Sequence, residues 1–329
     1  MTIFMASLTP MLTLFLCIVI GFIFTKTKIL PESASKTMAK METWIFCPAL
    51  SFMTMLRYCT IDSLSTHGVN IIMCSIAVVI AIIIAIPLAK VLIKKDKAEQ
   101  GIYSYALAFA NSGYMGDPIV LALFGEKVLA YYKLYCLPLS LVIYTWGISV
   151  LTPKSQTKGD AFKRLLNAPT IAMLVGLIMG LSGSGQYLPE FLISALDSLK
   201  SCMGPVAMLL AGVTIARFDV AGMIKNKKVY IATALRLVIL PAVIVAALFA
   251  IKLLANLIPD VSINNDVLFL CFFSVAMPLG MNTIVFPEAY GGNPQTGASM
   301  AMISHTLCVI SIPIMYALMV TVFGAPFIT

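Results

Sequence analysis

Charge is scarce in this sequence. Only 11% of its 329 residues are Asp, Glu, Lys or Arg, whereas 60% are hydrophobic. Soluble domains carry about 25% charged residues, so this composition leaves very little room for a soluble domain. The composition therefore predicts an all-α polytopic membrane protein that is surrounded by the lipid bilayer.

Motifs that would mark an enzyme or an ATP-driven pump are also absent. The sequence has no His-Glu-x-x-His or Gly-x-Ser-x-Gly motif for zinc or serine chemistry, and no Gly-x-x-x-x-Gly-Lys loop for ATP. Its eight cysteines have no paired short spacing, so we expect them to be small buried hydrophobes. No catalytic residue, metal ligand or cofactor is predicted.

Basic residues are confined mainly to the connections between apolar runs. The net charge of +8 therefore reflects orientation in a membrane rather than a nucleic-acid-binding face.

No Lys or Arg precedes Lys26, so the first apolar run lacks the basic start of a signal peptide and should remain as a span. Ten segments are long enough to cross a bilayer: residues 8–25, 34–56, 69–92, 101–124, 128–151, 167–181, 190–216, 229–254, 266–289 and 297–323.

The basic residues predict which side of the membrane each connection faces. Sixteen lie on one side, as Lys26, Lys28, Lys36, Lys40, Lys90, Lys94, Lys95, Lys97, Lys154, Lys158, Lys163, Arg164, Arg217, Lys225, Lys227 and Lys228. Four lie on the other side, as Arg57, Lys127, Lys133 and Lys252. The positive-inside rule places the first side in the cytoplasm. We therefore expect a multi-pass protein of the inner (cytoplasmic) membrane with both termini outside the cytoplasm.

The two halves of the chain share landmarks at a nearly constant offset. Leu30-Pro31-Glu32 recurs as Leu188-Pro189-Glu190, and Pro118 is matched by Pro278, 158 and 160 residues later. Each unit contains five predicted spans, so the second unit must insert upside down. The sequence predicts two inverted five-helix repeats, residues 1–152 and 153–329.

Two of the apolar runs are interrupted at corresponding places. Residues 110–118 hold an asparagine, two glycines, an aspartate and a proline, and residues 277–282 hold Pro278, Gly280 and Asn282. Backbone groups freed in hydrocarbon cost several kcal/mol each unless protein or water satisfies them. Paired broken helices mark the binding sites of transporters. We therefore expect helices 4 and 9 to be broken and to cross near the middle of the bilayer.

The polar groups at these breaks suggest a site for ions. Half-helix N-termini attract anions and C-termini attract cations, and Asn111 and Asn282 would either contact a ligand or cap freed backbone groups. Asp117 would bind a proton, Na⁺ or a cationic part of a substrate, or would cap the half-helix that Pro118 begins. His305 would titrate or bind a neighbouring carbonyl group.

Other charged residues within the predicted spans are weaker indications of a functional site. Asp197 and Lys200 are three residues apart and should pair along one helix face. Arg236 is expected to attract an anion or to pair with a carboxylate. We place Glu42, Arg57 and Glu288 near the membrane boundaries.

At these residues the chain resembles the auxin efflux carrier family of membrane transporters, with bacterial members that carry small organic acids. The matching motifs are Asn111-Ser112-Gly113-Tyr114-Met115-Gly116-Asp117-Pro118, Met277-Pro278 with Asn282, Cys47-Pro48-Ala49-Leu50, Ala289-Tyr290-Gly291-Gly292 and Ser311-Ile312-Pro313. The resemblance covers essentially the whole chain.

The resemblance implies a secondary transporter that works as an elevator with alternating access. Helices 1, 2, 6 and 7 would form a scaffold, often dimeric, and helices 3–5 and 8–10 would form the moving transport unit. A small organic anion such as a carboxylate would bind at Asn111, Pro118, Pro278 and Asn282, with Ser112 and Gly113 in the same stretch.

Two residues depart from the family pattern. Asp117 replaces an aliphatic residue and His305 a small hydroxyl residue, so we treat both as candidates for coupling transport to H⁺ or Na⁺. A carboxylate at Asp117 would repel an organic acid unless it is protonated or bound to a cation. A cation/proton antiporter with Asp117 as its ion site is therefore an alternative, and an intramembrane aspartyl protease that uses Asp117 and Asp197 is a more remote one.

Overall fold

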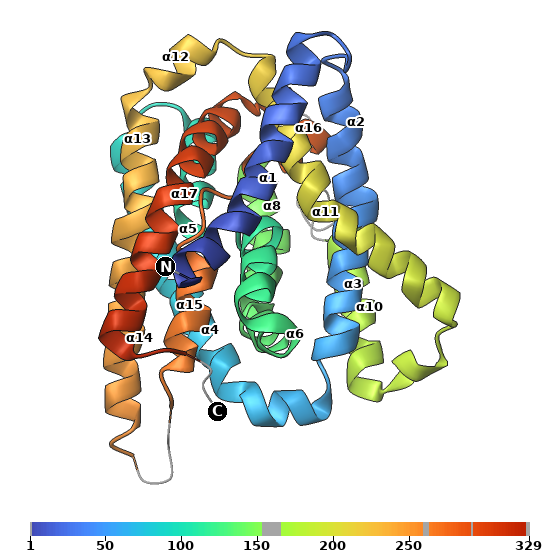
Figure 1. Cartoon of the computed structure of the whole chain (residues 1–329), viewed down its shortest axis with the longest axis vertical. Helices are drawn as coiled ribbons and strands as arrows, with labels where there is room; N and C mark the ends of the chain where they lie inside the picture. Colours follow the sequence, from blue (N-terminus) through green and yellow to red (C-terminus); the bar gives the residue numbers. More distant parts are fainter. Residues whose placement is uncertain (1, 153–165, 259–262, 291, 327–329) are drawn as a thin grey trace.

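The computed structural model describes residues 2–152, 166–258, 263–290 and 292–326, and the regular elements of these residues are helices. Figure 1 shows them as a bundle of roughly parallel and antiparallel helices. The predicted all-α architecture of a polytopic membrane protein is thus confirmed for the described residues. The basic residues Lys154, Lys158, Lys163 and Arg164, and the start of the predicted second repeat, lie outside the described residues.

The helices follow one another along the chain with short connections. The first half contains α1 (Thr2–Lys26), α2 (Ala34–Met41), η1 (Glu42–Phe46), α3 (Cys47–Tyr58), α4 (Ile61–Leu92), α5 (Lys97–Ala108), η2 (Ser112–Gly116), α6 (Asp117–Tyr135), α7 (Leu137–Val142), η3 (Ile143–Gly147) and α8 (Ile148–Leu151). The second half contains α10 (Ala168–Ser182), η4 (Ser184–Tyr187), α11 (Glu190–Ala216), α12 (Val220–Ile224), α13 (Lys227–Ala234), η5 (Leu235–Ile239), α14 (Leu240–Ala255), α15 (Asp266–Val275), α16 (Asn282–Tyr290) and α17 (Gln295–Phe323).

Five helices of the described chain are long and apolar enough to cross a bilayer without interruption. They are Leu8–Lys26, Gly68–Leu92, Glu190–Ala216, Lys227–Ala255 and Gln295–Phe323. Lys127–Tyr135 and Leu137–Leu151 would make a sixth span with a bend of 49°. The other predicted spans contain shorter or broken helices, so the count of ten stays a prediction.

Proline explains three local widenings of the helices. The turns η1, η2 and η5 are π-helical, with a backbone N–H bonded to the carbonyl five residues earlier. In each case a proline is the second residue of the next helix, as Pro48, Pro118 and Pro241. Proline has no N–H to donate and its ring presses on the preceding turn. A π-turn accommodates this defect, and such turns are frequent at functional sites.

Glycine allows two pairs of helices to pack backbone to backbone. Helix α1 packs along α11, where Gly21 faces the carbonyl of Leu209 and Gly212 faces the carbonyl of Ile18. Helix α10 packs along α3, where Gly176 and Gly180 face α3 backbone carbonyl groups. Small residues permit this close approach in membrane helices. Because α11 also contacts α3, the four helices form one packed group.

The remaining long helices pack on the other side of the molecule. In Figure 1, α13, α14, α15 and α17 lie on the left, α2, α3, α10 and α11 on the right, and α6 between them. Phenylalanine and tyrosine rings fill the interior of the left side, with Phe269, Phe272 and Phe273 fully buried. Large apolar side chains such as Ile83, Ile178 and Val322 are exposed on the outside, as expected of a surface that faces lipid.

Replacing Gly212 by alanine should destabilise the protein, because a Cβ there would collide with the backbone of Ile18 and with the N–H nitrogen of Phe22 at 2.7 Å. Overpacking of this kind typically costs about 1–3 kcal/mol. Thermal unfolding in detergent should therefore show a lower midpoint for Gly212→Ala. Gly68→Ala is the matched control, because nothing lies within 4 Å of a Cβ at that helical position. An equal effect of the two changes would contradict this account of the α1–α11 contact.

Candidate functional site

The first break interrupts the chain between α5 and η2. Helix α5 ends at Ala108, residues 109–111 leave the helical path, and the helix restarts at Ser112. Gly116 is needed here, because a Cβ at this residue would lie 2.6 Å from the hydroxyl of Tyr132 and 3.4 Å from the carbonyl oxygen of Phe273. The two glycines of this stretch thus lie in the π-turn η2 that follows the break, and Pro118 lies in the first turn of α6.

The second break lies between α15 and α16. Helix α15 ends at Val275 and the chain becomes helical again at Asn282. A Cβ on Gly280 would lie 3.1 Å from the ring of Tyr105 and 3.2 Å from the carbonyl oxygen of Phe109. Glycine at this position therefore lets the second break approach the first.

The two breaks cross and bond to each other. Ala110 and Leu279 form an isolated antiparallel bridge, in which the N–H of Asn111 donates to the carbonyl of Pro278 at 2.9 Å. The N–H of Leu279 donates to the hydroxyl of Ser304 at 3.3 Å. These contacts satisfy backbone groups that the breaks would otherwise leave unpaired in the interior.

Histidine orients the first of the two asparagines. His305 Nδ1 lies 2.9 Å from the carbonyl oxygen of Ala301, so this nitrogen carries the proton and donates it. Nε2 is then the acceptor for the Asn111 amide nitrogen at 3.1 Å. The Asn111 side-chain oxygen is buried and has no protein donor. Asn111 therefore keeps a free acceptor that water or a ligand can use.

Tyrosines hold the second asparagine. The Asn282 amide donates to the hydroxyl of Tyr105 at 2.7 Å, and the hydroxyl of Tyr114 donates to the Asn282 side-chain oxygen at 3.4 Å. Tyr132 joins the two breaks, because its hydroxyl lies 3.2 Å from the carbonyl oxygen of Ser112 and 3.1 Å from that of Phe273. Tyr114 belongs to the motif around the first break, but no role was predicted for it. Tyr105 and Tyr132 lie outside the motifs, and nothing in the sequence signals their long-range contacts.

A cavity of about 70 Å³ lies beside the crossing. A single water needs roughly 10–15 Å³ of such space, so the cavity can hold water or a small ligand. Of the predicted site residues, Asn111, Ser112, Gly113, Asp117 and Asn282 line it. Pro118, Pro278 and His305 do not line this cavity; they shape or orient the residues that do.

An ion pair forms part of the cavity wall. Lys133 of α6 pairs with Asp117, and the two side chains are only 11% and 15% exposed. Lys133 was expected on the outer side of the membrane, but its position inside an apolar run is typical of a buried charge with a partner. Asp117 is thus bound to a cation, which removes the repulsion that a free carboxylate would exert on an anion.

Arg236 caps the end of a half-helix. This fully buried side chain donates from Nη1 to the carbonyl of Leu107 at 2.9 Å and lies 3.4 Å from that of Ala108. These are the last carbonyl groups of α5, the negative end of the helix dipole. Among the described residues Arg236 thus pairs with backbone carbonyl groups and with no carboxylate. Its Nε and Nη2 atoms are buried without a hydrogen-bond partner, so the expectation that Arg236 attracts an anion stays a prediction.

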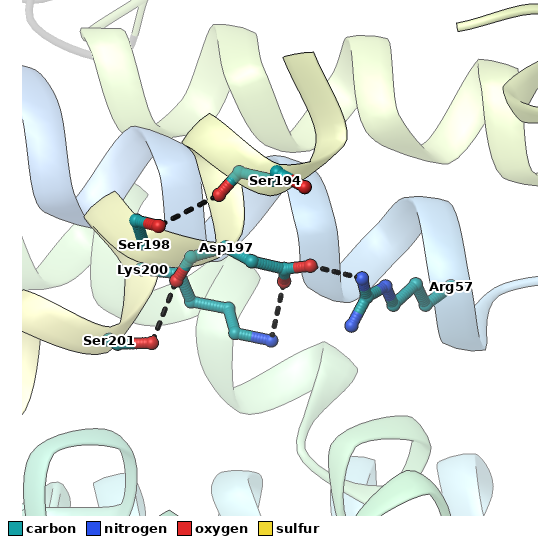
Figure 2. Close-up of polar contacts among 6 residues, drawn as sticks. All are labelled: Arg57, Ser194, Asp197, Ser198, Lys200 and Ser201. Atoms are coloured by element: carbon teal, nitrogen blue, oxygen red, sulfur yellow. Dashed lines mark hydrogen bonds and ion pairs between the residues drawn. The ribbon is translucent and has the colours of Figure 1, made fainter. Parts of the chain in front are cut away.

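A separate charge cluster lies near the N-terminal end of α11. Figure 2 shows Asp197 between Lys200, at 3.3 Å, and Arg57 from the end of α3. The predicted pairing of Asp197 with Lys200 is confirmed. Because Asp117 and Asp197 are each paired with their own cations, they do not form the shared carboxylate pair of an aspartyl protease.

Two carboxylates predicted near the membrane boundaries are covered by other parts of the protein. Glu42 is fully buried in η1. Glu288 is 9% exposed and pairs with Arg217, which also donates to the hydroxyl of Ser35 at 2.6 Å. Sequence position alone placed both near the ends of spans, but neighbouring helices cover them.

Comparison with known proteins identifies the type of protein. The model of a family described as "Membrane transport protein" matches residues 6–316. An uncharacterized transporter of Methanocaldococcus jannaschii is 22% identical over 321 residues, which cover 94% of this chain and 97% of that protein. The chain thus belongs to the membrane transport protein family, the auxin efflux carrier family that its motifs resemble, and is a membrane transporter rather than an enzyme.

Proposed function

We propose that this transporter moves a small organic anion, such as a carboxylate, across the cytoplasmic membrane. The observation that carries the proposal is the convergence of two half-helix N-termini and one lysine on the cavity at the crossing. Ser112 begins η2, Asn282 begins α16, and both line the cavity together with Lys133. These positive charges belong to the protein itself and do not depend on a bound substrate.

The charges around the cavity favour a bound anion. The first N–H groups of a helix have no helical partner, and they give its N-terminus about half a positive charge. The opposite dipole end of α5 faces Arg236 and is neutralised there. The cavity therefore receives two positive helix ends, whereas the Asp117–Lys133 pair adds no net charge. A carboxylate would be stabilised by the positive dipole ends of the two half-helices and by Lys133.

A cation site at Asp117 has less support. The ammonium group of Lys133 already occupies the position where a proton or Na⁺ would bind to that carboxylate. The ion-coupling roles predicted for Asp117 and His305 stay predictions. The contacts of these side chains show how they are positioned, but not which ion is coupled to transport.

The packing of the helices supports an elevator mechanism. The group made of α1, α3, α10 and α11 is held by glycine-mediated backbone contacts and would form the scaffold, with α2 and η1 leading into α3. The cavity lies between residues of α3 and α11 and the crossing breaks, that is, between the proposed scaffold and transport unit. Movement of the crossing against this group would expose the anion to each side in turn. A homodimer through the scaffold helices is part of the same proposal.

Purified protein should be screened by thermal shift against organic acids, at several pH values and with and without Na⁺. A ligand that binds the folded state raises the unfolding midpoint by mass action. We expect small carboxylates to stabilise the protein, and the best of them to accumulate in proteoliposomes. Neither stabilisation nor uptake by any small carboxylate would overturn the proposed substrate class.

Lys133→Met should weaken binding of the carboxylate found by that screen by about 10- to 100-fold, since a hydrogen bond to a charged group contributes about 1.5–3 kcal/mol. Lys127→Met is the matched control, because Lys127 lies on the same helix but is exposed. Asp117→Asn should instead tighten binding, because the carboxylate would no longer compete with Asp117 for Lys133. Isothermal titration of the three variants distinguishes these outcomes, and weaker binding by Asp117→Asn would contradict the role given to the ion pair.

The proposed orientation can be tested with reporter fusions. In Figure 1 the α1–α2 connection and α12 lie at one end of the molecule and the α3–α4 connection at the other. The positive-inside rule places the first end in the cytoplasm. Alkaline phosphatase fused to the C-terminus should therefore be active, whereas a fusion after Lys95 should be inactive. The reverse pattern would mean that the chain is inserted the other way round.

A further inference from the structure

Glu42 is a buried carboxyl group that the proposed anion site does not use. It is the first residue of the π-turn η1, is fully buried, and lies where η1 packs against α2, α3, α10, α11 and α16. Its Oε1 atom has no hydrogen-bond partner. Its Oε2 atom has only a weak contact, with the thiol of Cys47 at 4.0 Å.

No described cation compensates a charge on Glu42. Lysines 36 and 40 of α2 are exposed, and Arg217 is already paired with Glu288. The other titratable groups of the surrounding elements are Cys47, Arg57 and Tyr58 of α3, Tyr114 of η2, Tyr290 of α16, and Glu190, Asp197, Lys200 and Cys202 of α11; α10 has none. The two cations among them, Arg57 and Lys200, are both paired with Asp197. An unpaired ionised carboxylate in such a site is prohibitively costly. Glu42 therefore holds a proton in this conformation.

A series of polar contacts connects Glu42 to the crossing. The Cys47 thiol that contacts Glu42 also lies 3.3 Å from the hydroxyl of Tyr114. Tyr114 belongs to the first break and donates to Asn282 of the second break at 3.4 Å. Glu42 and Cys47 lie on elements of the proposed scaffold, whereas Tyr114 and Asn282 lie on the proposed moving unit. The contact between Cys47 and Tyr114 thus spans the interface at which the two parts would slide.

We propose that Glu42 is a proton-binding site that couples movement of the crossing to proton transfer. In the conformation described here, the crossing covers the protonated carboxyl group. When the crossing moves away from η1, water reaches Glu42, and the carboxyl group releases its proton to that water. The resulting carboxylate opposes return of the apolar cover until it is protonated again. One proton is bound and released in each cycle, with no other reactant.

This inference rests on the sliding interface of the proposed function, but its test requires no anion. The first measurement is infrared spectroscopy of the purified protein at neutral pH. A protonated carboxyl group gives a C=O band that shifts in D₂O. We expect this band in the unmodified protein and in the control Glu32→Gln, a change at an exposed glutamate. The band should disappear in Glu42→Gln.

Labelling with ¹³C-glutamate provides a second check in the unmodified protein, so it does not depend on folding of the variant. If the C=O band comes from Glu42, the ¹³C label must shift it. Absence of the band, a band that does not shift with the label, or a band that persists in folded Glu42→Gln would each overturn the protonated state of Glu42.

The second measurement tests the link between protonation and movement. Cys47 is 1% exposed between Glu42 and Tyr114, so N-ethylmaleimide should reach it only when the interface opens. Alkylation of Cys47 is followed by mass spectrometry from neutral to alkaline pH. The ratio of the rate in the unmodified protein to that in Glu42→Gln removes the pH effects that the two proteins share. A negative charge on Glu42 beside the thiol would by itself disfavour the reactive thiolate and lower this ratio, so a rise in the ratio reports opening of the interface. We expect this ratio to rise several-fold with pH, and a constant ratio would refute the coupling. Failure of the anion screen would leave both results intact.

Discussion

The structure depends on one constraint, which is that backbone N–H and C=O groups inside a bilayer must have partners. Two interrupted helices would violate this constraint separately. When they cross, each helps to supply partners for the other: Asn111 bonds to Pro278, and Ser304 bonds to Leu279. Tyr132 contacts a carbonyl group on each of the two interrupted helices, and Arg236 caps the end of α5. The polar pocket is thus a by-product of satisfying the backbone, and the helix N-termini in its wall are the basis of the proposed anion site.

The proposed preference of this pocket for anions depends on the asymmetry of the helix ends. A crossing of two broken helices presents both N-termini and C-termini, so the bare geometry has no net preference. Here the C-terminal end of α5 is bonded to a buried arginine, while the N-terminal ends at Ser112 and Asn282 face the cavity. Asp117, which from sequence alone argues against a carboxylate, is bound by Lys133. The electrostatic character of the site therefore comes from side chains distant in sequence from both breaks.

Several features could be predicted from sequence because their causes are local. Glycine, proline and asparagine within an apolar run mark the breaks, and the composition alone implies a helical membrane protein. The ion pair of Asp197 with Lys200 follows from their spacing on one helix. The partners of Asp117 and Arg236 and the burial of Glu42 could not be read in this way. They are fixed by which helices pack together, and a charge near the predicted end of a span can face either water or a covered interior.

The contact of Arg236 with α5 also limits how the molecule can move. Arg236 belongs to η5 in the second half of the chain, whereas Leu107 and Ala108 end a half-helix in the first half. Sliding these elements apart would leave a guanidinium group and two carbonyl groups without partners in a region that water does not reach. The two halves of the chain therefore cannot move as independent rigid bodies. Any displacement must carry α5, η5 and the crossing together, as a body assembled from both halves.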